Sequence, residues 1–308
     1  MLVTMNEVLQ DAKKGHYAVG LFNAVTLELA QGIIAAAEET GSPVIFGTAE
    51  VLLPYNSLED LAMILIPMAK RAKVPVVVHL DHGLHKETCL KALKLGFSSI
   101  MYDCSTESYE VNCERVREMT EIAHSYGASI EGEIGHVGGA EGAETAQQQA
   151  DASKFYTTPQ EAKDFVDRTG VDALAIAVGT AHGAYKLPPK LDFDRIRTIA
   201  RTVPTPLVLH GGSGLTDEDF RKAIEAGISK VNILTDINIA AVESAMAHFT
   251  SMGKGIIDLL PSVREAVKLS VIEKMQLFGS CGKAPVSPQP DEALVRRVVE
   301  EVLRSYGR

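Results

Sequence analysis

Short runs of apolar and β-branched residues recur along the chain and alternate with stretches of helical periodicity. The runs are mostly continuous rather than alternating, which is typical of parallel strands buried on both faces. Eight strands are predicted, over residues 18–23, 44–48, 74–81, 98–103, 129–134, 173–178, 206–210 and 230–234. The helices predicted between them cover residues 27–39, 58–71, 86–95, 111–124, 159–168, 193–201 and 218–226.

This order predicts an α/β fold of the (β/α)8 TIM-barrel type as one domain over residues 1–283. The alternative is an open doubly wound sheet. Such a sheet would usually carry a glycine-rich turn after its first strand, where this chain has FNAVT at 22–26.

Three segments depart from the repeat. Residues 136–158 form a long irregular stretch after the fifth strand, which we interpret as an active-site lid, with a disordered insertion as the alternative. A further helix is predicted over 262–278, followed by a Pro-rich linker at 284–290. Residues 291–308 then place their apolar positions on one stripe and predict an amphipathic terminal helix.

Composition narrows the classes of function. The chain is 46% hydrophobic and 23% charged, and its net charge of -10 with no long basic run argues against a nucleic-acid partner. No apolar stretch is long enough to span a membrane, the amino terminus lacks a signal-peptide pattern, and the four cysteines lack paired spacing. We therefore expect a soluble cytoplasmic enzyme without a membrane partner.

Three histidines, His82, His182 and His210, follow predicted strands at their carboxyl ends. Barrel enzymes place their active sites at this end of the strands, and three imidazoles with an open position are typical of catalytic zinc. Each histidine alone would more often be a hydrogen-bonded structural group than a ligand, but three on separate strands favour a metal site. Cobalt or manganese are alternatives to zinc.

Carboxylates occur at the same strand ends. Asp81 precedes His82 and could exchange a proton with a substrate hydroxyl or, alternatively, orient an imidazole. Asp103 and Glu133 could hold a second, harder cation or serve in structural hydrogen bonds.

A phosphate site is predicted after the seventh and eighth strands, where barrels tend to bind phosphate. Gly211, Gly212 and Ser213 precede a helix whose start carries the capping pair Thr216 and Asp219, so that backbone N–H groups and a helix amino terminus could meet an anion. Asn232 and Thr235 end the eighth strand. The residues thus predict a metal-dependent barrel enzyme acting on a small phosphorylated molecule.

Six motifs add a family resemblance: HLDHG (79–83), MYDCS (101–105), EGEIGHVGG (131–139), VGTAHGAYK (178–186), LHGGSG (209–214) and KVNILTD (230–236). In this order, over about residues 3–283, they resemble the class II ketose-bisphosphate aldolases, which include fructose- and tagatose-bisphosphate aldolases.

The resemblance implies a role for each matching position. His82, His182 and His210 match the ligands of the catalytic zinc, and Asp103 and Glu133 match a second metal site. Asp81 matches the acid/base acting on the C4 hydroxyl, and Glu141 matches the glutamate that moves the proton of the dihydroxyacetone phosphate carbon. The matching positions for substrate and phosphate are Gly183, Gly211, Gly212, Ser213, Asn232, Ile233, Leu234 and Thr235.

The implied reaction is reversible cleavage of a phosphorylated ketose to dihydroxyacetone phosphate and an aldehyde, through an ene-diolate stabilised by zinc. Lys186 and Lys230 are interpreted as phosphate contacts, because a Schiff-base role for either would leave the histidines unexplained. A monovalent cation is a further candidate cofactor.

The chain departs from the family pattern at Leu234 and Asn238, where fructose-bisphosphate members often carry Asp and Arg. A tagatose-type or modified ketose phosphate is therefore an alternative substrate. Gly142 likewise stands where the family's lid often carries an acidic residue.

The terminal helix over 291–308 resembles encapsulation peptides of bacterial microcompartment enzymes, and packing on a neighbouring subunit is the alternative. The family resemblance implies a homo-dimer or tetramer. Two other functions stay open at this point: a metal-dependent hydrolase and a non-catalytic sugar-phosphate binder on the same barrel.

Overall fold

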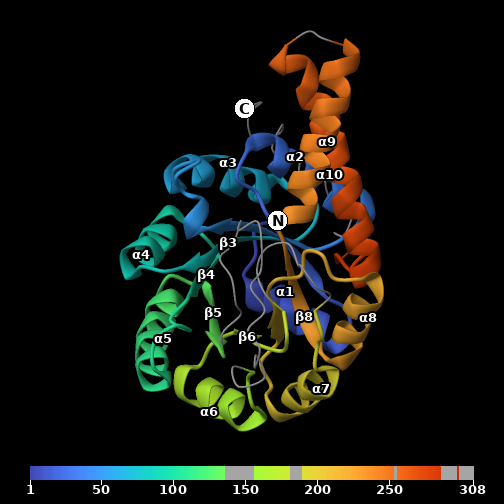
Figure 1. Ribbon diagram of the computed structural model, residues 1–308. Helices are drawn as coiled ribbons and strands as arrows, with labels where there is room; N and C mark the ends of the chain where they lie inside the picture. The colour runs from blue at the N-terminus through green and yellow to red at the C-terminus, as the bar shows by residue number, and fades with distance from the viewer. Residues whose placement is uncertain (136–155, 181–188, 253–254, 286–296, 298–308) are drawn as a thin grey trace.

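Eight parallel strands close into a barrel in which each strand pairs with the next in the chain and the eighth pairs with the first (Figure 1). This computed structural model describes residues 1–135, 156–180, 189–252, 255–285 and 297. The strands are β1 (Val19–Asn23), β2 (Val44–Ala49), β3 (Val76–Gly83), β4 (Ser99–Tyr102), β5 (Ser129–Ile134), β6 (Ala173–Ile176), β7 (Leu207–Leu209) and β8 (Ile228–Ile233). Their residues are buried throughout, which explains the continuous apolar runs. The predicted TIM barrel is confirmed, and the open sheet is wrong.

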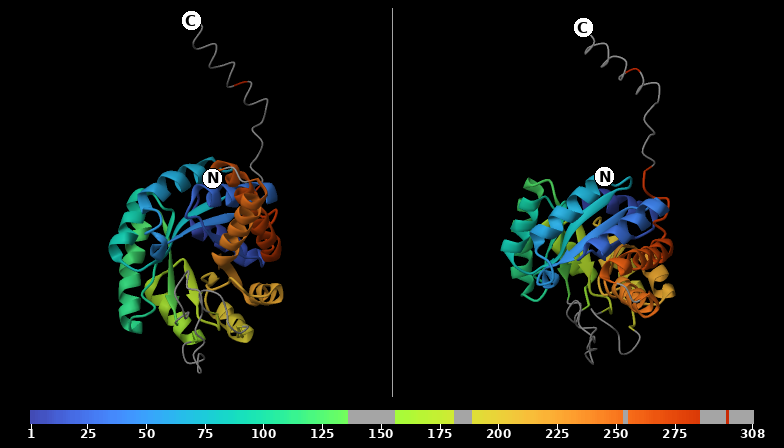
Figure 2. Two further views of the ribbon diagram at one scale, coloured as in Figure 1. Left: turned by 45° about the horizontal axis from the view of Figure 1, so that its top comes forward. Right: turned by 90° about the horizontal axis from the view of Figure 1, so that it is seen from above.

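Helices surround the barrel, as Figures 1 and 2 show from three directions. They are α1 (Met5–Gly15), α2 (Leu27–Thr40), α3 (Leu58–Arg71), α4 (Lys86–Leu95), α5 (Tyr109–Ser125), α6 (Pro159–Thr169), α7 (Phe193–Thr202), α8 (Asp217–Ala226), α9 (Thr235–Met252) and α10 (Ile256–Phe278), with a short 3-10 helix at Glu50–Leu52. Hydroxyl caps set several starts: Thr26 accepts from the backbone N–H of Leu29, and Thr158 from that of Glu161. The seven helices predicted between strands are confirmed to within two residues at either end.

Helix α1, which the apolar pattern did not predict, closes the end of the barrel opposite the strands' carboxyl ends. Its buried face carries Met5, Val8, Leu9 and Ala12, which pack against inward-facing side chains near the beginnings of the strands. The terminal ammonium of Met1 donates to the carbonyl groups of two residues just before β3. Side chains therefore fill the barrel interior at this end, and an active site can form only at the carboxyl ends of the strands.

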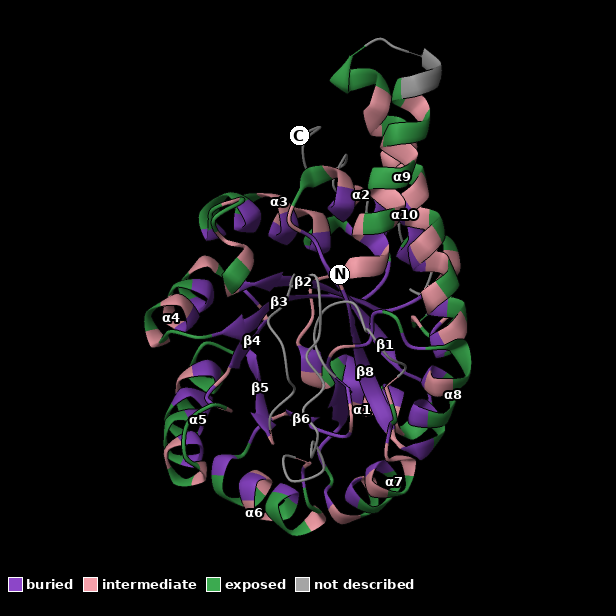
Figure 3. Ribbon diagram, viewed as in Figure 1, coloured by how far each residue is buried: buried purple, intermediate pink, exposed green. Residues whose placement is uncertain are grey.

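Helices α9 and α10 lie side by side and project past the ring of helices (Figure 1). Helix α10 begins at Ile256, six residues before the predicted start, and Pro261 lies inside its second turn. Helix α9 was not predicted. Both helices expose much of their surface (Figure 3), and none of the described helices is long and apolar enough to cross a membrane.

Several predictions fall outside the described residues. They are the greater part of the lid, most of the linker and terminal helix, and the site residues Glu141, His182, Gly183 and Lys186. These stay predictions, as does the microcompartment interpretation.

Candidate active site

Strand β3 carries two of the predicted site residues at its carboxyl end. Asp81 is fully buried and faces the barrel interior, and His82 follows it with a left-handed φ of 42°. The register of β3 against β4 shifts between Leu80 and Gly83, so the strand is irregular where His82 lies. A non-glycine residue in this conformation is uncommon and often marks a functional position. Here the left-handed turn at His82 directs the side chains of both Asp81 and His82 toward one site.

The imidazole of His82 is oriented by Asp103, which follows β4. Nδ1 of His82 lies 2.8 Å from Oδ2 of Asp103, and Oδ1 of Asp103 accepts from the backbone N–H of Ser105 at 3.0 Å. Burial alone would raise the pKa of the Asp103 carboxyl, but the hydrogen bonds from His82 and Ser105 hold it well below its usual range. An ionised carboxylate only accepts, so Nδ1 of His82 carries the proton and Nε2 presents a lone pair.

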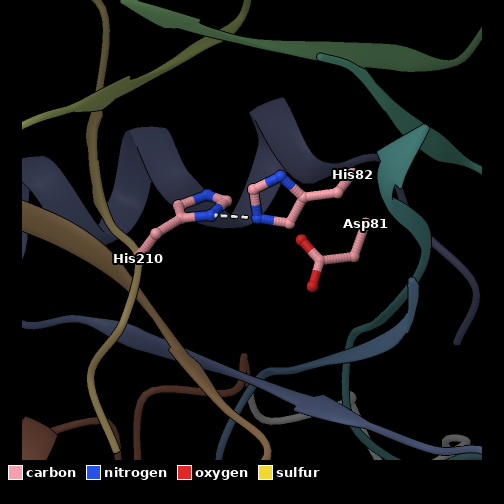
Figure 4. Close-up of side chains that lie close together, drawn as sticks. All are labelled: Asp81, His82 and His210. Carbon is pink, nitrogen blue, oxygen red and sulfur yellow. Dashed lines mark hydrogen bonds between the residues drawn. The ribbon is translucent and has the colours of Figure 1, made fainter. Parts of the chain in front are cut away.

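His210, the residue after β7, is oriented by a second carboxylate. Its Nε2 lies 2.7 Å from Oε1 of Glu131, and both side chains are fully buried. A carboxylate only accepts, so Nε2 of His210 donates to Glu131 and Nδ1 of His210 presents its lone pair. That Nδ1 atom lies 2.6 Å from Nε2 of His82, with the two rings nearly perpendicular at 87° (Figure 4).

This geometry fits a bound metal ion. Two imidazole lone pairs directed at each other repel unless a cation or a proton lies between them, whereas a divalent cation would accept both. Asp81, His82 and His210 each bring one candidate ligand atom within 4.8 Å of the others. His82, Asp103 and Glu133 form a second such group, so the residues predicted for a second metal site also lie together.

Asp81 is held by two asparagine side chains. The Nδ2 group of Asn232 donates to Oδ1 of Asp81 at 2.9 Å, and Nδ2 of Asn23 donates to Oδ2 at 3.4 Å. Gly47 makes room for Asn23, because a Cβ atom at this glycine would collide with Oδ1 of Asn23 and with Leu21. Asp81 therefore contacts amide donors, and Asp103, not Asp81, orients the imidazole.

The predicted phosphate loop lies over the adjacent strand ends. Gly211 has a φ of 64°, and a Cβ atom at Gly212 would lie only 2.9 Å from the backbone oxygen of Asn232, so glycine allows the two loops to approach. Oγ of Ser213 accepts from the backbone N–H of Thr235 at 3.2 Å, and Thr216 caps α8 as predicted. Ile233 and Leu234 continue from Asn232 at this edge, and Leu234 is half-buried.

Lys230 occupies a different place from a phosphate contact. Its side chain is fully buried, and Nζ lies 2.9 Å from Oε2 of Glu131 and 2.8 Å from Oδ1 of Asn232. His79, predicted as a satisfied interior group, accepts or donates a 2.7 Å hydrogen bond with Ser99. Burial, and next the charge of Lys230, lower the pKa of His79 to about 3, so its ring is neutral.

Sequence reasoning missed Glu131, Asn23 and Glu50. A signal existed for Glu131, because it lies two residues before Glu133 on a buried strand and therefore shares its inward face. The same spacing relates Lys230 to Asn232. Glu50 had no such signal: it accepts from the backbone N–H groups of Leu84 and His85 and so holds the turn that follows His82.

Comparison with known proteins covers nearly the whole barrel. Residues 3–283 match the family model described as fructose-bisphosphate aldolase class-II. The fructose-bisphosphate aldolase of Thermus caldophilus is 41% identical over an alignment that covers 92% of this chain and all of that protein. The probable fructose-bisphosphate aldolase of Bacillus subtilis is 39% identical, with coverage of 92% of this chain and 99% of that protein.

Two solved structures are also similar to this chain over almost its whole length. The crystal structure of the YdjI aldolase from Escherichia coli K12 superposes with a TM-score of 0.83 at 37% identity, covering 92% of this chain and all of that one. A putative fructose-1,6-biphosphate aldolase from Coccidioides immitis gives a TM-score of 0.82 at 31% identity, covering 91% and 97%.

Proposed function

Because the chain belongs to the class-II fructose-bisphosphate aldolase family and is therefore an aldolase, a lyase, we propose that it reversibly cleaves a ketose 1,6-bisphosphate or a similar phosphorylated ketose. The products are dihydroxyacetone phosphate and an aldehyde. The observation that best supports this function is the convergence of His82 and His210 beside Asp81. It joins candidate metal ligands to a candidate acid/base within one buried site.

The proposed metal is a catalytic zinc ion held by His82 and His210 together with His182, and Asp103 and Glu133 are candidates for a second divalent ion. When bound, zinc supplies a Lewis acid that polarises the ketone oxygen and stabilises the negative charge left by carbon–carbon cleavage. Asp103 and Glu131 hold the two described rings in the tautomers that coordination requires.

Protons move through two carboxylates in this proposal. Asp81 takes the proton of the C4 hydroxyl as the C3–C4 bond breaks, so that C4 becomes the aldehyde carbon and the bonding electrons remain with C3. Glu141 delivers a proton to C3, which completes dihydroxyacetone phosphate. Asn232 and Asn23 donate to the two oxygens of Asp81 and hold this carboxylate directed at the site.

The phosphate next to the reacting ketone is assigned to the loop Gly211–Ser213 and the turn after β8. Backbone N–H groups in a glycine-rich loop before a helix suit an anion, and Thr216 fixes the amino terminus of α8 nearby. Gly183 and Lys186 complete this assignment from the family pattern.

The preference at the far end of the sugar is proposed to differ from that of fructose 1,6-bisphosphate aldolases. Leu234 has no polar side chain, and the Nδ2 group of Asn238 donates to the backbone oxygen of Leu234 at 3.0 Å. Neither position offers a charge to the substrate. A tagatose-type or modified ketose phosphate is therefore a candidate substrate.

Assembly into a homo-dimer or tetramer is part of the proposal, and α9 supports it. This helix carries two acidic residues and neither Lys nor Arg, and Ile237 is its one buried residue among those described. Ile239, Val242, Met246 and Phe249 recur every three or four positions and are 51–66% exposed. A helix this apolar is normally covered, and a second copy could cover the stripe in a two-fold arrangement.

A retro-aldol assay over a panel of ketose 1-phosphates and 1,6-bisphosphates, with and without EDTA, tests the function. Release of both dihydroxyacetone phosphate and an aldehyde, lost with EDTA and restored by zinc, cobalt or manganese, is expected. Release of inorganic phosphate alone would indicate a hydrolase, and binding without turnover a sugar-phosphate sensor. His210→Ala should abolish cleavage, whereas His124→Ala, at a half-exposed histidine on α5, should not. Cleavage that survived both EDTA and His210→Ala would refute the metal assignment.

A further inference from the structure

A continuous chain of buried polar groups joins His210 to Asp81 through the barrel interior. Glu131 accepts from His210 with one oxygen and pairs with Lys230 through the other. Lys230 then donates to Oδ1 of Asn232, and Asn232 donates to Asp81. Four side chains in this series of contacts are only 0–5% exposed: Glu131, Lys230, Asn232 and Asp81.

Lys230 is the group in this chain that compensates the charge of Glu131. A buried carboxylate is costly without an opposite charge, and Nζ of Lys230 lies 2.9 Å from it. His79 also lies near, 3.9 Å from Oε2 of Glu131, but its ring is neutral. Among the described residues, the ammonium of Lys230 is thus the formal cation paired with Glu131.

Lys230 also selects the orientation of the Asn232 amide. An ammonium group has donors and no acceptor, so it can only face the amide oxygen. The amide nitrogen must then point the other way, toward Asp81, where the carboxylate needs a donor. An amide turned by 180° would place two donors against each other at Lys230 and two acceptors against each other at Asp81.

We propose that Lys230 is a positioning residue for the acid/base Asp81 and acts through the amide of Asn232. Its ion pair with Glu131 also balances the negative charge of the carboxylate that holds His210. This inference rests on the proposed aldolase function and extends it to a lysine that touches neither phosphate nor ketone. Two other roles fit its environment less well: a phosphate contact would need an exposed ammonium, and a Schiff-base nucleophile would need a neutral amine within reach of the ketone.

Two partial reactions separate these roles. Cleavage of the ketose requires Asp81, because the C4 hydroxyl loses its proton there. Exchange of deuterium into dihydroxyacetone phosphate alone requires the metal and Glu141 but involves no C4 hydroxyl. A defect confined to Asp81 therefore slows cleavage and spares exchange.

The test is Lys230→Met in the full chain, with bound metal, cleavage and deuterium exchange measured in parallel. We expect kcat for cleavage to fall about 10- to 100-fold, with KM, exchange and metal content near those of the unchanged protein. Lys91→Met, at a half-exposed lysine of α4 paired with Glu59, is the matched control and should change none of them. Failure of the unchanged protein to cleave any ketose or to exchange deuterium would refute the aldolase function rather than the role of Lys230.

A second variant guards against simple unfolding. Lys230→Met leaves Glu131 buried without its cation, and Lys230→Gln does the same but keeps an N–H donor that can face the amide oxygen of Asn232. Both variants should lose thermal stability, whereas cleavage should stay closer to that of the unchanged protein in Lys230→Gln. An equal loss of cleavage in the two variants would overturn the proposal, and so would a rise in KM for both reactions or a loss of metal matching the loss of both activities.

Discussion

Nε2 of His82 and Nδ1 of His210 face each other at 2.6 Å, although the two residues are 128 positions apart in the chain. The other nitrogen of each ring is hydrogen-bonded to a carboxylate, that of Asp103 for His82 and that of Glu131 for His210. Asp103 follows β4 and Glu131 lies within the neighbouring strand β5, so the site depends on how β4 and β5 lie beside each other as much as on the histidines themselves.

Asp103→Asn should weaken metal binding without unfolding the barrel. Asparagine can present its NH2 group to Nδ1 of His82 and so favour the wrong tautomer, which puts a proton on Nε2. We expect the affinity for zinc, measured by competition with a chelator, to fall about 10- to 100-fold. Asp167→Asn, at an exposed aspartate of α6 paired with Lys163, is the control. Equal zinc affinity in the two variants would contradict the orienting role of Asp103.

Gly47→Ala should disturb catalysis from a position that contacts no substrate in the proposed site. The added Cβ atom would collide with Asn23 and Leu21, so Asn23 must move away from Asp81. We expect the free energy of unfolding to fall by about 1–3 kcal/mol and kcat for cleavage to fall about tenfold or more. Gly255→Ala is the control, because the nearest atom to its Cβ would be Oδ2 of Asp258 at 4.0 Å, an ordinary van der Waals contact. An unchanged kcat would show that the contact between Asn23 and Asp81 is dispensable.

The pair formed by Glu50 and His85 should give the turn after β3 a pH-dependent stability. The hydrogen bond with Glu50 raises the pKa of His85 above 6.5, so this contribution is complete below pH 6.5 and is lost as pH rises through the raised value. Burial opposes ionisation of Glu50, yet its hydrogen bonds to His85, Thr88 and Leu84 lower its pKa below 4.5. Its contribution is complete above pH 4.5 and is lost as pH falls through the lowered value.

Both contributions are therefore complete between pH 4.5 and 6.5. Thermal unfolding of the unchanged protein and of Glu50→Gln, followed across this interval and beyond it on both sides, should differ most within it. Thr88→Val, which removes one donor and keeps the ion pair, should retain the alkaline part of the profile. A difference in Tm that did not vary with pH would refute the assignment.

Val242→Glu with Phe249→Glu should prevent self-assembly. The two side chains lie two turns apart on the exposed stripe of α9, so charges there would face their copies in a two-fold interface. Sedimentation velocity should show the oligomer replaced by a monomer of unchanged secondary structure. Tyr126→Glu, at a half-exposed aromatic residue after α5, should leave the mass unchanged. An oligomer that persisted in the double variant would show that α9 is not the interface.

The sequence alone determined the barrel and the places of His82, His210 and Asp81 at its strand ends. Continuous apolar runs separated by helical periods leave few folds other than eight βα units, because such strands must be buried on both faces. His82, His210 and Asp81 follow or end these runs, and the strand ends of a barrel meet at one face. The comparison with relatives then agrees with the motifs over the same residues, 3–283.

Local patterns failed for the two helices that do not belong to a simple repeat. Helix α1 precedes the first strand and becomes necessary only once the barrel has an open end to close. Helix α9 carries an exposed apolar stripe in addition to its buried residue Ile237, so its apolar positions do not mark one buried side. Such a helix is recognised from the surface it leaves exposed, which is a property of the folded chain.

Only the tertiary structure decided which polar groups meet inside the barrel. Spacing of two residues places Lys230 and Asn232 on one face of β8, and Glu131 and Glu133 on one face of β5. Whether Lys230 reaches a phosphate or Glu131 depends on strand register and closure, which bring β5 and β8 face to face across the interior although they are not neighbours in the sheet. Side-chain pairing across a closed barrel is non-local, and the residue pattern along one strand carries no record of it.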